Sequence, residues 1–165
     1  MSEPVVSVEV TGRIPKRVQS LGDGVFMDAA LFFTGMVFKG CKVKGVCTVD
    51  IEFVKPEGDF LGQALYLGDG DVEIQLNPMQ SQRSTLLTLA HELVHAKQYI
   101  TGEMKDSRKS IDYTIWRNKQ IKINDHSYYD LPWEVEAMGR EYGLYRRWVE
   151  SRNYSGKYAW ANTSF

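Results

Sequence analysis

The segment at residues 84–101, STLLTLAHELVHAKQYIT, constrains the fold more than any other part of the chain. Apolar residues recur around most of its circumference at helical spacing. A narrow polar strip carries Thr88, His91, Glu92, His95 and Tyr99. A helix that is apolar on most sides must be covered on most sides. We therefore expect an internal helix, capped by Ser84 and ended by Gly102, whose polar strip faces a cleft.

Two of the three histidines of the chain lie on this strip, in the order HELVH. His91 and His95 are four residues apart, so both imidazoles project from one face of the helix, one turn apart. That spacing lets both bind one Zn²⁺ ion. Glu92 lies about 100° around the helix from His91, where its carboxylate can face a water on the metal without binding the metal. This pattern indicates metal-assisted hydrolysis with Glu92 as general base.

A zinc site of this kind needs a third protein ligand. The downstream candidates are His126, Glu134, Glu136 and Glu141. A last helix is expected to open at Asp130-Leu131-Pro132, and its helical wheel places Glu134 within the apolar face. A carboxylate on a buried face needs a partner, and Zn²⁺ is a sufficient one. Glu134 is therefore the predicted ligand.

The other candidates have different expected roles. Glu136 lies on the solvated face of the wheel, where it is expected to pair with Arg140 at i,i+4. It remains the alternative third ligand, with His126 as a further alternative. Glu141 lies near Glu134 on the wheel and can accept a hydrogen bond from a ligand histidine.

The remaining elements are short. Residues 25–38 are apolar and predict a buried helix, whereas residues 46–54 alternate and are rich in β-branched side chains, as in a strand. Residues 62–68 and 71–77 predict two more strands, joined by a glycine-rich hairpin turn.

This order of elements contains no strand–helix–strand alternation, the pattern that predicts a parallel sheet. We therefore predict an α+β fold with an N-terminal helix, a three-stranded, mainly antiparallel sheet, the HExxH helix and a C-terminal glutamate helix. Residues 1–165 are expected to form one domain with a core at about 25–150. An insert at 103–130 is expected to contain a hairpin turning at Asn118-Lys119 and can act as a lid. A turn-rich tail occupies 151–165.

The composition is that of a soluble globular domain, with 43% hydrophobic and 25% charged residues. A net charge of −1 gives no electrostatic reason to expect nucleic acid or an anionic membrane as a partner. The most apolar window is interrupted by Asp28 and is too short to cross a bilayer. No signal-peptide pattern is present, and Cys41 and Cys47 are expected to be reduced. A cytoplasmic protein is therefore expected.

HELVH at 91–95, followed by WEVEA at 133–137, resembles the gluzincin metallopeptidases, in particular their small single-domain members in bacteria and bacteriophages. The resemblance implies a zincin-like core with one Zn²⁺ ion per chain. In such families the third ligand is a glutamate three residues before an alanine, as Glu134 stands to Ala137. Several of them place Asp or Asn directly after that alanine. This chain has Met138 there, so that role is vacant or filled elsewhere.

The resemblance also implies that the strand at 71–77 borders the cleft and pairs with an extended peptide substrate. Main-chain groups at positions such as Glu73 and Gln75 would make these hydrogen bonds. A donor for the reaction's oxyanion would come from the loop before the glutamate helix, with Tyr128 and His126 as candidates. A phage-encoded member would act in the host cytoplasm or inside the virus particle.

The sequence thus predicts a zinc-dependent peptidase acting on a peptide or protein substrate. The alternative is a zinc-bearing protein that uses the same fold as a structural or binding module without proteolysis. A DNA-associated protease is disfavoured by the net charge and by a carboxylate third ligand, and His126 as ligand would favour it.

Overall fold

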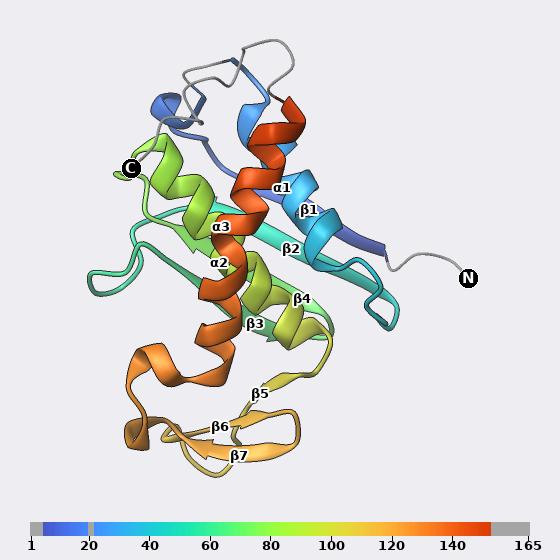
Figure 1. Cartoon of the computed structure of the whole chain (residues 1–165), viewed down its shortest axis with the longest axis vertical. Helices are drawn as coiled ribbons and strands as arrows, with labels where there is room; N and C mark the ends of the chain where they lie inside the picture. Colours follow the sequence, from blue (N-terminus) through green and yellow to red (C-terminus); the bar gives the residue numbers. More distant parts are fainter. Residues whose placement is uncertain (1–4, 20–21, 153–165) are drawn as a thin grey trace.

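The computed structural model describes residues 5–19 and 22–152 (Figure 1). Over these residues it contains three α-helices, three short 3-10 helices and two β-sheets, which confirms the mixed α+β class. The α-helices are α1 (Val25–Val37), α2 (Gln82–Ile100) and α3 (Pro132–Arg152). The 3-10 helices are η1 (Lys16–Gln19), η2 (Ile123–Asp125) and η3 (Tyr128–Asp130). The predicted tail lies outside the described residues from position 153 onward.

None of the helices in the described ranges combines the length and the apolar character needed to cross a bilayer. α1 matches the predicted apolar helix and includes Asp28 in its first turn. The window that is most apolar in the sequence therefore forms part of a folded core.

The larger sheet has four strands in the order β1-β2-β4-β3. Its strands are β1 (Val5–Thr11), β2 (Val46–Phe53), β3 (Gly62–Gly68) and β4 (Asp71–Leu76). β1 pairs with β2 and β2 pairs with β4 in parallel, whereas β3 runs antiparallel to β4. The predicted three-stranded, mainly antiparallel sheet is therefore wrong in both strand number and strand direction.

Connectivity explains the parallel pairs. α1 joins β1 to β2, so the three elements form a strand–helix–strand unit that returns the chain in the same direction. β3 and β4 form the predicted hairpin, but β3 takes the edge position and β4 lies directly beside β2. The prediction lacks β1, although Val6, Val8 and Val10 alternate with polar residues along it.

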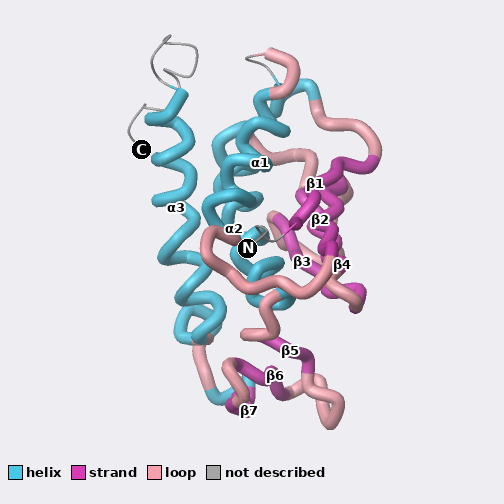
Figure 2. Tube along the Cα trace, turned by 90° about the vertical axis from the view of Figure 1, so that its right-hand side faces the viewer, coloured by secondary structure: helices cyan, strands magenta, loops and turns pink. Residues whose placement is uncertain are grey.

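The α-helices cover one face of the larger sheet, and α2 lies between the sheet and α3 (Figures 1 and 2). α2 contacts β3, β4, α1 and α3. Because neighbours pack on several sides of it, α2 is enclosed around most of its circumference, as its apolar pattern predicts. Its fully enclosed apolar residues are Leu86, Leu89, Ala90, Leu93, Val94 and Ala96.

α2 begins before the predicted cap. The hydroxyl oxygen of Ser81 accepts a hydrogen bond from the Ser84 main-chain N–H at 3.2 Å, so Ser81 is the N-cap. The prediction of Ser84 as cap is wrong by almost one turn. Gly102 follows the helix with a φ of 77°, a conformation that glycine adopts at little cost, and it ends α2 as predicted.

The smaller sheet is antiparallel, in the order β5-β6-β7, and lies at one end of the molecule (Figure 1). Its strands are β5 (Met104–Asp106), β6 (Tyr113–Trp116) and β7 (Lys119–Lys122). Arg117 and Asn118 connect β6 to β7 with φ values of 46° and 66°, as a tight two-residue hairpin turn requires. The hairpin predicted within 103–130 is confirmed, but its turn lies one residue earlier than predicted, since Lys119 already pairs with Trp116. Trp116 packs in a small cluster with Leu131 and Trp133, which joins this sheet to the start of α3.

The central position of α2 can be tested through Leu89, which is fully buried in the main core. We expect Leu89→Ala to lower the free energy of unfolding by about 2–5 kcal/mol, because it removes buried methyl groups and leaves a cavity. Leu31→Ala is the matched control, since Leu31 is 57% exposed on α1 and should change stability by about 0.5 kcal/mol or less. Urea unfolding followed by circular dichroism compares the two. Equal effects would contradict the enclosure of α2.

Candidate metal centre

Three potential metal ligands converge where α2 and α3 pack together. His91 and His95 project from α2, and Glu134 lies in the first turn of α3. His91 Nε2 is 3.1 Å from Glu134 Oε2, and His95 Nε2 is 3.3 Å from Glu134 Oε1. The two histidine Nε2 atoms are 3.0 Å apart. Ligands of a tetrahedral Zn²⁺ ion, each about 2.0–2.1 Å from it, lie about 3.3 Å from one another. Both the donor types and their spacing therefore fit a metal ion.

The far side of each imidazole is held by a side-chain oxygen. His91 Nδ1 lies 2.6 Å from Glu141 Oε2, and His95 Nδ1 lies 2.8 Å from Gln98 Oε1. When Nδ1 carries the proton and donates it to these acceptors, Nε2 is left with its lone pair facing the centre. Glu141 thus occupies the position expected of an acceptor for a ligand histidine. Gln98 has the same position at the other histidine and was not among the predicted site residues.

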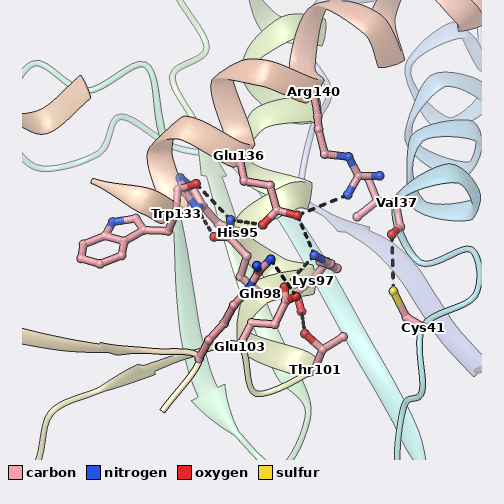
Figure 3. A network of polar contacts seen from close by, with 11 residues as sticks. Val37, Cys41, His95, Lys97, Gln98, Thr101, Glu103, Trp133, Glu136 and Arg140 are labelled. Carbon is pink, nitrogen blue, oxygen red and sulfur yellow. Dashed lines mark hydrogen bonds and ion pairs between the residues drawn. The ribbon is translucent and has the colours of Figure 1, made fainter. Parts of the chain in front are cut away.

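The orientation of the Gln98 amide follows from its other contacts (Figure 3). Its Nε2 donates to the Trp133 carbonyl at 3.0 Å and to Glu136 Oε2 at 2.9 Å. Because the amide nitrogen is engaged there, the amide oxygen is the group that faces His95. Gln98 is fully buried, so this chain of hydrogen bonds is shielded from water.

Glu136 belongs to the hydrogen-bond chain that orients Gln98, and not to the metal cluster (Figure 3). Its Oε1 lies 2.7 Å from Lys97 Nζ, whereas Arg140 NH1 is 3.8 Å away. Lys97 also donates to Glu103 at 2.6 Å. Glu136 is not the alternative metal ligand, since the cluster contains Glu134 in its place. The predicted i,i+4 ion pair of Glu136 with Arg140 is confirmed, but this face of the helix is not solvated, because α2 covers this side of α3. Two of its residues, Lys97 and Gln98, reach the carboxylate.

The charges in the cluster are complementary. Burial lowers the pKa of His91, but hydrogen bonds to Glu134 and Glu141 raise it to about 10. Burial raises the pKa of Glu134, but hydrogen bonds from His91 and His95 lower it to about 2. The negative potential that favours protons on the imidazoles also favours a divalent cation between them, and such a cation competes with those protons.

Glu92 lies beside this cluster and is buried, with 6% of its surface exposed. Burial raises its pKa, against the opposing influence of His95 and His91. A carboxylate in such surroundings is a stronger base than one in water, which suits proton transfer at neutral pH.

Of the two predicted oxyanion donors, Tyr128 and His126, the structure places only Tyr128 at the cluster. The Tyr128 hydroxyl donates to Glu134 Oε2 at 2.7 Å, and burial together with Glu134 raises the pKa of Tyr128, so the phenol keeps its proton. Its side chain remains half exposed and faces the cluster from solvent. His126 is exposed, and within the described residues its side chain makes no hydrogen bond to the cluster.

β4 is not an edge strand. Its main chain pairs with β2 on one side and with β3 on the other, over nearly its whole length. The prediction that Glu73 and Gln75 offer main-chain groups to a substrate is therefore wrong, because hydrophobic alternation does not reveal which strand occupies the edge. Their side chains bond to each other, with Gln75 Nε2 2.7 Å from Glu73 Oε1.

The exposed edge next to the cluster belongs to β3. A Cβ atom at Gly62 would lie 2.6 Å from Thr88 Cγ2 and 3.3 Å from Glu92 Cγ. The start of β3 therefore approaches α2 so closely at Glu92 that a side chain has no room. β3 then runs toward the end of α2, where Tyr66 stacks on Tyr99 with ring centroids 5.5 Å apart.

Comparison of the chain with protein-family models, with curated proteins and with solved structures yields no match.

Metal content tests the ligand set. We expect about one zinc ion per wild-type chain and a strong loss in Glu134→Ala, because two histidines alone do not form a stable protein zinc site. Inductively coupled plasma mass spectrometry of dialysed protein gives the stoichiometry. Glu150→Ala is the control, since it removes an exposed carboxylate of the same helix. If the Glu134→Ala variant retained its zinc, the assignment of Glu134 as the third ligand would be wrong.

The role of Gln98 has a separate prediction. Gln98→Leu keeps the side-chain volume but removes the acceptor for His95 Nδ1, so we expect zinc affinity to fall about 10–100-fold. Competition with a chromophoric chelator measures the dissociation constant. Gln120→Leu, at an exposed position of β7, should leave it unchanged. Equal affinities for both variants would mean that Gln98 does not orient the ligand.

Proposed function

We propose that this protein is a zinc-dependent peptidase whose metal is held by His91, His95 and Glu134. The observation that carries the proposal is the convergence of these three groups beside a buried glutamate, Glu92. Two histidines and a carboxylate leave one position of a tetrahedral zinc free, as catalytic zinc sites do. A bound zinc ion would supply a Lewis acid and lower the pKa of a water molecule to about 7.

The side chains around the metal have distinct roles in this proposal. Glu92 accepts the proton of the attacking water and later donates it to the leaving amine nitrogen. The Tyr128 hydroxyl, which stays protonated, turns from Glu134 Oε2 to donate its one hydrogen bond to the oxygen on which negative charge develops. Glu141 and Gln98 keep both imidazoles oriented throughout.

The substrate in this proposal is an extended polypeptide segment that pairs with the free edge of β3. Edge strands with exposed main-chain groups readily pair with another chain. Large apolar side chains are exposed along β3 and just before it, at Phe60, Leu61, Leu65, Tyr66 and Leu67. Because Gly62 lies against Glu92, a segment paired with β3 passes close to the general base.

We also propose a zincin-like core for the part of the fold that surrounds the centre. The supporting features are the α2 helix with its histidine pair, a sheet that packs on α2 and has an antiparallel edge strand, and the glutamate of α3. The resemblance of HELVH and WEVEA to the gluzincin motifs agrees with this assignment.

A change at Glu92 tests the mechanism. Glu92→Gln should keep the zinc content and the fold but slow peptide cleavage by about 10²–10⁴-fold, because it removes the general base. A peptide library incubated with zinc-loaded protein and read by mass spectrometry provides both the cleavage sites and the rates. Glu73→Gln, on the part of β4 that bears no catalytic role, is the matched control.

Three outcomes of this experiment have different meanings. Loss of cleavage in Glu92→Gln alone supports the peptidase. Cleavage by Glu92→Gln at the wild-type rate would overturn the mechanism. A wild-type protein that binds zinc and retains peptides on β3 without cleaving any of them would favour the alternative, a binding module on the same fold.

A further inference from the structure

A groove of about 1280 Å³ opens where the end of α2, one end of the larger sheet and the smaller sheet meet. Segments far apart in the sequence line it, among them residues 42–47, the β3–β4 turn and residues 99–109. Small-molecule pockets have volumes of about 300–1000 Å³, so this groove has room for a stretch of polypeptide.

The groove is positively charged. Its basic residues are Lys42, Lys44, Lys105, Arg108 and Lys109, and its acidic residues are Asp69 and Asp106. Five positive minus two negative charges leave +3, whereas the whole chain carries −1, so the remainder carries −4. All five basic side chains are exposed, and within residues 5–19 and 22–152 none of them forms an ion pair with a carboxylate. Their charges are therefore free to act on a ligand.

The groove lies further along α2 and β3 from the candidate metal centre. Tyr99 lines it and lies one helical turn after His95 on α2. Tyr66, which also lines it, stacks on Tyr99 from the edge strand β3. Tyr66 is four residues along β3 from Gly62, and a strand rises about 3.3 Å per residue. A segment that pairs with β3 beside Glu92 therefore reaches the groove about 13 Å further on.

We propose that this groove binds an acidic stretch of the polypeptide substrate, about three to six residues from the bond that is cleaved. The inference rests on the proposed peptidase function for its position relative to the scissile bond. Carboxylate side chains of the ligand face the five basic residues, and its main-chain N–H groups can donate to Asp69 and Asp106.

An acidic polypeptide fits these features better than nucleic acid does. A continuous row of phosphates would meet Asp69 and Asp106 within the groove and the net negative charge of the rest of the chain. A polypeptide carries its carboxylates on flexible side chains and also offers donors, so it satisfies both signs of charge. The groove also lies along β3 from the glutamate and histidines suited to peptide hydrolysis.

A binding measurement tests the groove without relying on cleavage. Zinc-loaded, full-length protein with Glu92→Gln is titrated with a fluorescein-labelled peptide that contains a block of glutamates, and with the same peptide in which glutamines replace the block. Fluorescence anisotropy gives the dissociation constants. We expect the glutamate peptide to bind more tightly, with a difference that shrinks as ionic strength rises.

The decisive variant neutralises three groove residues, in Lys44→Gln/Lys105→Gln/Arg108→Gln. We expect it to weaken binding of the glutamate peptide about tenfold. The control, Arg13→Gln/Lys16→Gln/Arg147→Gln, changes the net charge equally at exposed residues outside the groove and should bind as the parent does. Equal dissociation constants for the two triple variants would overturn the proposal. A single-stranded oligonucleotide that binds the groove more tightly than the glutamate peptide would overturn it as well.

Cleavage kinetics separate this inference from the proposed function. If wild-type protein cleaves peptides but shows no preference for a nearby glutamate block, the groove assignment fails and the peptidase stands. If the glutamate peptide binds in a groove-dependent way but is never cleaved, the groove assignment stands and the peptidase fails.

Discussion

The packing of α3 on α2 is the contact on which the site depends, because it buries charged groups that must find partners. Lys97 is 7% exposed, and an unpaired ammonium so deeply buried would cost several kcal/mol or lose its proton. Glu136 and Glu103 supply the two carboxylates that it needs. Glu134, two residues before Glu136 on α3, meets the histidines. Contacts on different sides of one turn fix both the rotation of α3 and its height along α2, so the structural ion pairs and the ligand geometry depend on each other.

The parts of the fold that sequence reasoning predicts correctly are those with local causes. α2 follows from helical periodicity, and the hairpin at Arg117 and Asn118 follows from its turn-forming residues and flanking alternation. The strand order has long-range causes. Whether β4 pairs with β2 depends on where β3 is placed, and no pattern within 71–77 carries that information. The alternating valines of β1 were a local signal, and their assignment as a strand would have exposed the strand–helix–strand unit with α1.

The site residues, like the fold, fall into those that local sequence predicts and those that depend on long-range packing. The spacing of His91 and His95 is a property of one helix, and the apolar face around Glu134 is a property of another, so a helical wheel indicates both. Gln98 is an ordinary polar residue on the helical wheel of α2. Its role appears only once α3 covers it and Glu136 accepts a hydrogen bond from its amide nitrogen. The helical wheel of α3 assigns Glu136 to solvent, because a wheel describes one helix without the neighbouring helix that packs on it.

Charge is unevenly distributed over the two sides of the larger sheet. Glu9, Asp50 and Glu73 lie in register across β1, β2 and β4, and they alternate with residues such as Val49 and Ile51 that face the helices. Like charges directly opposite one another on neighbouring strands reduce stability, and they make the helix-free face negative. The groove beside α2 has the opposite sign. The acidic polypeptide proposed as ligand would therefore be repelled from one face and attracted toward the groove. A field of this kind raises association rates most at low ionic strength, so under the proposed function the charge pattern would steer the substrate before it reaches the candidate metal centre.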